Sequence, residues 1–171
     1  MLEKLLKVVV YGDLLQKMLT KNRVYEVNRG ETQKLYDEWM QKCKELVVHS
    51  SLSEFKKSIY DMVNDFEKIE LDTSMKKPKV GIVGEVLIKY HPFGNNFIAE
   101  KLEQEGAEVI LPDFMGFVKF MATHKITFNT LIKTDKYKAK IFKLAIKLID
   151  ILEKDERIAL ANSKKGYLQP D

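Results

Sequence analysis

Apolar side chains recur at helical spacing over the N-terminal part of the chain. Over residues 2–19, leucine, valine and methionine stand three and four positions apart, which predicts a helix with a broad buried face. The valine run at 8–10 is also compatible with a short strand. A second helix is predicted over about 32–48, with Trp39 and Cys43 on its apolar side.

The third predicted helix carries the clearest pattern. Ser51 is followed three residues later by Glu54, which is the capping-box arrangement of a helix N-terminus. The apolar stripe behind it comprises Leu52, Phe55, Ile59, Met62, Phe66 and Ile69. A stripe of this kind packs against a core more often than it recruits a partner. We therefore interpret residues 1–75 as a packed helical region.

Strand-like sequence follows a polar segment, residues 71–78, that ends in proline. Residues 79–83 are short, β-branched and apolar, which is typical of a strand buried on both faces, and residues 107–111 are similar. Two such strands separated by a helix form a βαβ unit, which is almost always parallel and right-handed. We therefore predict an α/β fold, with a Rossmann-like α/β region at 79–171 preceded by the α-helical region.

The helix between the two strands has recognisable ends. Asn95 or Asn96 can cap its N-terminus, and it extends over about 97–105 to Gly106, where glycine accommodates a left-handed C-terminal cap. Two strands form too small a sheet to be stable alone. Further strands are expected either in the ambiguous segments downstream or on polypeptide outside this chain.

The remaining sequence predicts two more helices. One begins at Pro112-Asp113 and ends near 123–124, and the other is capped by Asp135 and extends to about Lys154. Between them, residues 125–134 are ambiguous and include Ile126–Phe128 as a possible short strand. In the last helix, a lysine stripe opposite the apolar side is most simply a solvated face; it comprises Lys136, Lys140, Lys143, Lys147 and Lys154.

Charge and composition narrow the possible partners. The 29 basic and 25 acidic residues give a net charge of only +4, and the lysines are dispersed, which argues against nucleic acid as the main partner. No apolar run approaches the length of a membrane span, and no secretory signal pattern is present. The single cysteine, Cys43, excludes an intrachain disulfide and fits a reducing compartment, so we expect a cytoplasmic protein.

The polar loop after the first predicted strand is the candidate site. Ligands of open α/β sheets bind beyond the carboxyl ends of the strands, where helix N-termini offer free N–H groups. Glu85 could accept a proton or bind a hydroxyl, His91 could act as an acid or base, and Asn95 and Asn96 could orient a carbonyl or phosphate. Alternatively, these side chains bond the backbone of their own loop and serve only as caps.

Several familiar catalytic motifs are missing from the sequence. Gly81 and Gly84 do not complete the three-glycine dinucleotide fingerprint, and there is no Walker A loop, HExxH or GxSxG motif. The three histidines, His49, His91 and His124, are too scattered to define a metal site. A self-contained nucleotide hydrolase or hydride-transfer enzyme is therefore not expected.

Residues 79–96 and 103–113 contain two motifs that together resemble the 2-hydroxyacyl-CoA dehydratase and activase-related proteins. Residues 79–96, KVGIVGEVLIKYHPFGNN, and residues 103–113, EQEGAEVILPD, are similar to the family patterns VGE(I/V)LVK(Y/F)xPxxNN and EGAEVxxPD. Further upstream, residues 12–15, GDLL, and residues 25–32, YEVNRGET, resemble the family's DLL and PYExNxGET segments, with Val24 in place of the usual proline. Glu26 and Asn28 are thereby additional candidates for ligand binding.

The resemblance implies a Rossmann-like fold and a part in the radical dehydration of 2-hydroxyacyl-CoA thioesters in anaerobic metabolism. In that family an ATP-driven activase with a 4Fe-4S cluster supplies the electron, and the dehydratase subunits bind iron–sulfur clusters through their own cysteines. With Cys43 alone, this chain is expected to hold no cluster and no other cofactor. The cluster is expected in the related full-length proteins or in the partners.

The preferred interpretation is therefore a domain of a dehydratase-type or activase-related protein that is not a complete catalyst. Its expected partners are the dehydratase subunits, or the remaining domains of a larger chain, and possibly an acyl-CoA. The alternative is a binding or interaction module without chemistry of its own.

Overall fold

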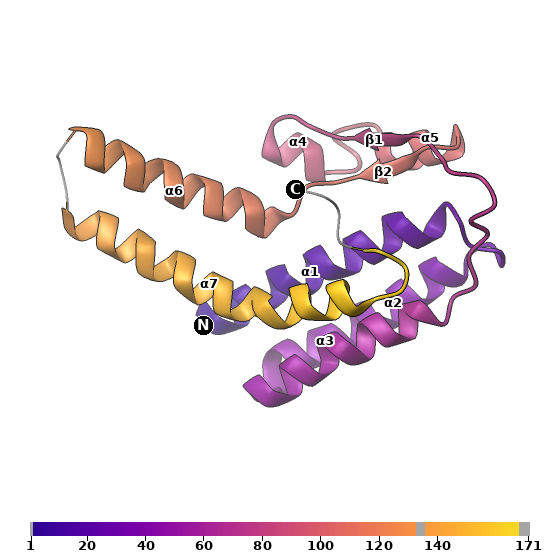
Figure 1. Ribbon diagram of the computed structural model, residues 1–171, viewed down its shortest axis with the longest axis horizontal. Coiled ribbons are helices and arrows are strands. Elements are labelled where there is room, and N and C mark those ends of the chain that lie inside the picture. The colour runs from indigo at the N-terminus through magenta and orange to yellow at the C-terminus, as the bar shows by residue number, and fades with distance from the viewer. Residues whose placement is uncertain (1, 133–135, 168–171) are drawn as a thin grey trace.

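The computed structural model describes residues 2–132 and 136–167, and it is mostly helical (Figure 1). The N-terminal region contains three long helices, α1 (Leu2–Arg23), α2 (Glu31–His49) and α3 (Leu52–Glu67). The strands β1 (Lys79–Gly81) and β2 (Glu108–Ile110) have three residues each, and α4 (Val86–Tyr90) and α5 (Ile98–Gln104) lie between them in the sequence. Two long helices follow, α6 (Phe114–Ile132) and α7 (Lys136–Asn162).

The predicted Rossmann-like α/β fold class is wrong. The two predicted strands do pair in parallel, with Val80 opposite Val109, but the described residues contain no further strand of that sheet. The segment 125–134 adds none where it is described: Ile126–Phe128 is helical and extends α6, because Val118, Ala122 and Ile126 keep one apolar side turned inward. The valine run at 8–10 also lies within a helix, α1.

The N-terminal helices agree with their sequence patterns. Ser51 Oγ accepts the backbone N–H of Glu54, and the Glu54 carboxylate accepts the backbone N–H of Ser51, so the predicted capping box is confirmed. Five of the six stripe positions of the third helix, all except Leu52, are buried, and they meet α1 and α2 in one apolar cluster. The Tyr11 ring packs edge-on against Phe55, with 5.0 Å between centroids.

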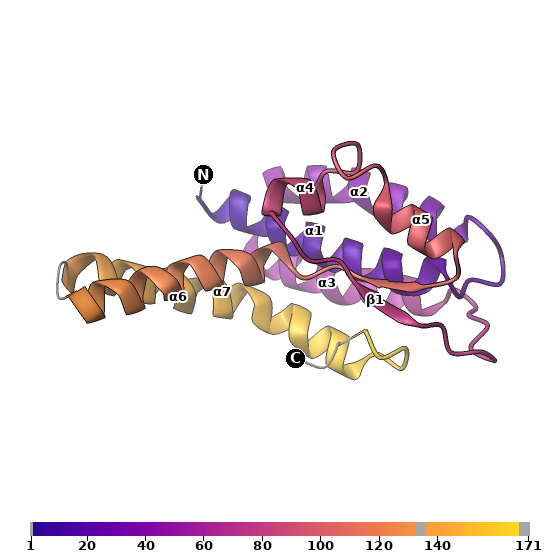
Figure 2. The same cartoon turned by 90° about the horizontal axis from the view of Figure 1, so that it is seen from above.

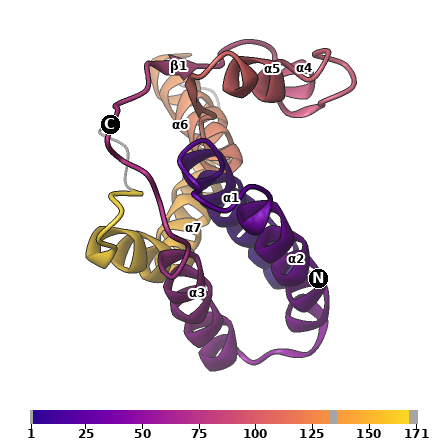
Figure 3. The ribbon, with the colours of Figure 1, turned by 90° about the vertical axis from the view of Figure 1, so that its right-hand side faces the viewer.

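The helices before and after the linker at 71–78 share one hydrophobic core. Met115 of α6 and Ile149, Leu152 and Leu160 of α7 belong to the same buried cluster as the side chains of α1, α2 and α3. In Figure 3, α7 lies beside α1 and α3. The expected helix cap at Asp135 lies outside the described residues.

The sheet sits on the end of α1 through a buried carboxylate. Glu108 at the start of β2 accepts hydrogen bonds from Lys21 Nζ and from Tyr25 Oη, each at 2.9 Å. The Tyr25 hydroxyl in turn accepts the backbone N–H of Lys77 at 3.2 Å. A buried charge with this many donors is compensated. Figure 1 shows β1 and α4 above α1.

A second buried cluster ties the C-terminal helices to α1. Asp13 accepts the backbone N–H groups of Phe114 and Met115 and so caps α6 from 101 positions away. Lys17, one turn further along α1, bonds Asp113 at 2.8 Å and Glu156 of α7 at 2.9 Å. Burial raises the pKa of Asp13 to about 6 and that of Glu156 to about 7, despite the neighbouring ammonium of Lys17.

These raised pKa values predict a stability that increases as the pH falls from 8 to 6. A carboxyl group whose pKa is higher in the folded state stabilises the fold fully below its ordinary pKa, and this contribution is lost as the pH rises through the folded value. The melting temperature should therefore be higher at pH 6 than at pH 8. In Glu156→Gln this difference should shrink, because the group no longer titrates. A difference as large as that of the parent protein would show that another group is responsible.

Candidate functional site

The predicted site loop begins at Gly84 and contains the short helix α4. Glu85 is the N-cap of α4: its Oε2 accepts the backbone N–H groups of Leu87 at 2.8 Å and Ile88 at 3.1 Å. Gly84 precedes it with φ of 151°, a left-handed conformation that favours glycine. Glu85 thus holds the turn from β1 into α4.

The other polar side chains of this loop also bond to loop backbone. His91 Nδ1 accepts the backbone N–H of Gly94 at 2.9 Å. Asn95 Nδ2 donates to the carbonyl oxygens of Ile88 and Lys89 at 3.0 and 3.1 Å, and its Oδ1 accepts the N–H of Ile98 at 3.3 Å at the start of α5. These bonds make a compact, self-supporting turn, as expected for polar side chains that compete for local backbone groups.

Asn96 shapes the same turn through its backbone. Asn96 and Phe97 have φ of 59° and 54°, so two successive left-handed residues turn the chain into α5. Asparagine adopts this conformation more readily than most residues, whereas phenylalanine does so rarely. The predicted left-handed cap at Gly106, with φ of 88°, is confirmed at the other end of α5.

The apolar side chains of this loop point to solvent. Val83, Leu87 and Phe93 are 85%, 76% and 80% exposed, and Ile88 is also exposed. Strand β1, which leads into the loop, pairs only with β2 among the described residues, so its other edge offers unpaired backbone groups. We call Val83, Leu87, Ile88 and Phe93 the α4 apolar surface. Sequence reasoning missed it, because the sequence predicts that Val83 belongs to a strand buried on both faces, whereas β1 ends at Gly81 and Val83 is exposed.

Tyr90 fixes the end of α4 on the helical body. Its hydroxyl donates to the carbonyl oxygen of Pro112, and its ring packs edge-on against Phe114 with 5.7 Å between centroids. Burial raises the pKa of Tyr90 to about 12. The loop is therefore anchored at its centre while its apolar side chains remain outside.

The remaining candidates, Glu26 and Asn28, lie in a different place. Glu26 accepts the backbone N–H groups of Gly30 at 2.6 Å and Thr32 at 2.8 Å, which closes the loop ahead of α2. Asn28 Nδ2 donates to Glu31 Oε2 at 3.2 Å. The structure thus does not gather the six predicted residues into one site: four shape the α4–α5 turn and two shape the α1–α2 loop.

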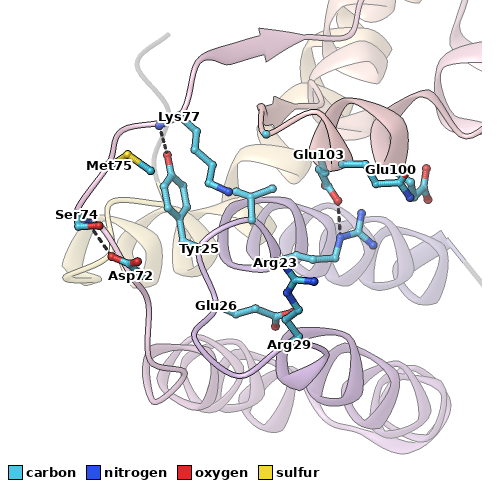
Figure 4. A pocket seen from close by; sticks show the side chains of 13 residues that line it. Arg23, Tyr25, Glu26, Arg29, Asp72, Ser74, Met75, Lys77, Glu100 and Glu103 are labelled. Carbon is cyan, nitrogen blue, oxygen red and sulfur yellow. Dashed lines mark hydrogen bonds and ion pairs between the residues drawn. The ribbon is translucent and has the colours of Figure 1, made fainter.

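Glu26 lines a hollow of about 720 Å³ between the α1–α2 loop, the linker before β1 and α5 (Figure 4). Its charged lining residues are Arg23, Arg29, Lys77, Glu26, Asp72, Glu100 and Glu103. Arg23 Nε pairs with Glu103 at 2.6 Å, and the Lys77 ammonium lies 5.6 Å from the centre of the Tyr25 ring. With four carboxylates and three cations, the lining does not form the concentrated basic surface that favours the phosphates of a CoA ester.

Asn95 lines a smaller hollow of about 260 Å³ together with Gln33 and Tyr90; Glu85 and His91 are not part of its lining. Among the described residues, no group of three or more histidine, cysteine or acidic side chains is arranged to hold a metal ion. Within the same residues, no helix has the length and apolarity that crossing a bilayer demands.

Cys43 is packed in the core between α1 and α2, and burial raises the pKa of its thiol to about 12. Iron–sulfur clusters bind cysteine thiolates, commonly four of them. We therefore predict that the purified chain, reconstituted anaerobically with iron and sulfide, shows no visible iron–sulfur absorbance. A stoichiometric cluster on the folded monomer would contradict this account of Cys43.

Comparison of this chain with family models, with curated proteins and with solved structures gave no match.

Proposed function

We propose that this chain is a docking module of the 2-hydroxyacyl-CoA dehydratase/activase system, and that it contributes no reacting group of its own. Its partner is a dehydratase-type subunit or a further domain of the activase-related protein. The proposal combines the resemblance of residues 79–96 and 103–113 to that family with the way the same residues are used in the fold.

One observation carries the proposal: the polar side chains of the family-like loop are bonded to the loop's own backbone, whereas several of its large apolar side chains are exposed. Glu85, His91 and Asn95 are bonded to backbone atoms of their own loop. Leu87 and Phe93, in contrast, are largely exposed. Exposed apolar side chains that cluster on one surface mark interaction sites more often than catalytic ones. The free edge of β1 beside them can accept a further strand.

Binding to an anaerobically purified 2-hydroxyacyl-CoA dehydratase tests the proposal. Leu87→Asp places a charge on the α4 apolar surface and should weaken binding at least about tenfold, as loss of a buried interface anchor does. Met75→Asp is the matched control, because Met75 is similarly exposed, at 78% against 76% for Leu87, but lies in the linker before β1. Absence of binding by the parent chain, or equal binding by the two variants, would refute the docking role.

A second candidate role is contact with an acyl-CoA through Glu85. The backbone N–H groups of Leu87 and Ile88 both bond to Glu85 Oε2, so Oε1 can still accept a hydrogen bond from a substrate hydroxyl. Glu85→Gln keeps an oxygen for the cap, and its melting temperature should stay within a few degrees of the parent value. Under this role the same variant loses calorimetrically measured binding of a 2-hydroxyacyl-CoA. A collapse of folding would instead make Glu85 purely structural.

A further inference from the structure

The distal part of the α6–α7 hairpin carries an apolar stripe that no described element covers. The two helices pack on each other and extend beyond the body formed by α1, α2 and α3 (Figure 1, Figure 2). On α7, Phe142, Ile146 and Ile149 are buried or half-buried, whereas the stripe on another side of the helix is exposed. This stripe consists of Ile141, Leu144, Leu148 and Ile151, at 65%, 69%, 41% and 58% exposure. We call it the α7 stripe.

The spacing of the α7 stripe is that of a coiled-coil seam. Its members follow one another at three, four and three residues, which places Ile141 and Leu148 at a positions and Leu144 and Ile151 at d positions of a heptad. On a helix face that contacts only water, polar residues would be better solvated than these apolar side chains. The repeat therefore indicates a packing surface.

The stripe continues into a contact that already exists. The next position in the same register is Asp155, which pairs with Lys56 of α3 at 3.2 Å and accepts a hydrogen bond from Tyr60 of α3 at 3.4 Å. Near the body, therefore, this face of α7 is covered by α3. Further out, where α3 no longer reaches, the same face is open, and a separate helix can take the place that α3 occupies nearer the body.

The charges beside the stripe define what that helix must carry. Lys140 and Lys147 are exposed and occupy the g positions directly ahead of the two a positions. Over residues 140–151, which include the whole stripe, the sequence contains three lysines and a single acidic residue, Asp150, which pairs with Lys119 of α6 at 2.6 Å. Because charges at e and g positions select the partner of a coiled coil, a helix with acidic residues along its apolar seam is favoured and a basic one is rejected.

The same charges disfavour a second copy of this chain. An antiparallel pair of α7 helices would bring g positions together and set lysine against lysine, and a parallel pair would set Lys140 against Ala145 of the other copy, with no compensating charge. We propose that the α7 stripe binds an acidic amphipathic helix of another polypeptide, which packs along the distal part of α7 as α3 does nearer the body. This inference is independent of the docking role of the α4 apolar surface.

A designed peptide probe tests the proposal on the full chain. The probe is a peptide of about three heptads with leucine at a and d and glutamate at e and g, and its counterpart has lysine in place of every glutamate. We expect the acidic peptide to bind the parent protein saturably in isothermal titration calorimetry, and more weakly as sodium chloride is raised. The lysine peptide should not bind.

Two aspartate variants make the test specific to the stripe. Leu144→Asp should weaken binding of the acidic peptide at least about tenfold, while Leu131→Asp should bind like the parent. Leu131 is a fair control because it is 77% exposed on the same hairpin but belongs to α6. Both variants replace exposed side chains and should retain the parent's melting temperature and helical circular dichroism.

Four outcomes would overturn the inference. The first two are that the acidic peptide fails to bind the parent protein and that the two variants bind it equally. The third is that the parent protein sediments as a dimer and the Leu144→Asp variant as a monomer, which would assign the stripe to a second copy of the chain. The fourth is that phosphatidylglycerol vesicles bind the parent protein but not the Leu144→Asp variant, while the acidic peptide binds neither protein. This result would assign the stripe to an anionic membrane surface.

Discussion

Replacing Lys17 by methionine is expected to lower the free energy of unfolding by about 3 kcal/mol at pH 8. The substitution leaves the carboxylate of Glu156 buried beside Asp113 without its cation, and breaking one partner of a buried ion pair typically costs about 3–5 kcal/mol. For a chain of this size we expect a melting temperature lower by roughly 6–12 °C. Thermal unfolding followed by circular dichroism measures this change in melting temperature.

The loss should be smaller at pH 6 than at pH 8. The pKa of Glu156, raised to about 7 by burial, allows the group to become neutral at the lower pH, which removes the uncompensated charge. Lys68→Met is the control, because Lys68 pairs with Asp65 at 2.8 Å on the surface and such pairs contribute at most about 1 kcal/mol. Equal effects of the two variants would contradict a buried charge cluster that joins α1 to α7.

Replacing Phe66 by alanine is expected to lower the free energy of unfolding by about 3–5 kcal/mol. Phe66 is fully buried where α3 meets the other core helices, so the change removes apolar contacts and leaves a cavity. Phe93→Ala deletes the same atoms from a side chain that is 80% exposed, and its effect should stay within about 0.5 kcal/mol.

Urea unfolding of the two phenylalanine variants and the parent measures both changes in the free energy of unfolding. A strong loss of stability in Phe93→Ala would mean that the α4 apolar surface supports the fold and is not open for docking. If the Phe66→Ala variant had the same free energy of unfolding as the parent, the assignment of a core shared by α3 and α7 would be contradicted.

The N-terminal half could be predicted from the sequence because its signals are local. The capping box at Ser51 and Glu54 and the stripe ending at Ile69 need only neighbouring residues, and the structure confirms α3 with this cap. The parallel pairing of the two short strands was also predictable from their composition and the helix between them. The error lay in extending this unit to a Rossmann-like region, when the residues after Pro112 continue as long helices.

Long-range polar contacts could not be predicted in the same way. Nothing near Asp13 reveals that it caps a helix beginning at Phe114, and Lys17 reads locally as a surface lysine although it joins Asp113 and Glu156. One hint was available, since Lys17 interrupts a dense run of buried leucine and methionine on α1. A charge held in an apolar face requires a partner somewhere in the fold.

The candidate site shows a different limit of sequence reasoning. Glu85 and Asn95 were both open to two interpretations, ligand binding or capping, and spacing alone does not separate them. The structure shows both side chains bonded to backbone atoms of their own loop. The outward direction of Leu87 depends on how Tyr90 anchors α4 against Phe114, a contact made across 24 positions of the chain.

Hydrogen–deuterium exchange of the chain, alone and with the anaerobically purified dehydratase, tests the docking account most directly. The account predicts slowed exchange over the segment from β1 through α4, residues 79–90, with the Leu87→Asp chain showing none of this protection. Protection confined to the hollow around Glu26 and Arg29, or no change anywhere along the chain, would contradict it.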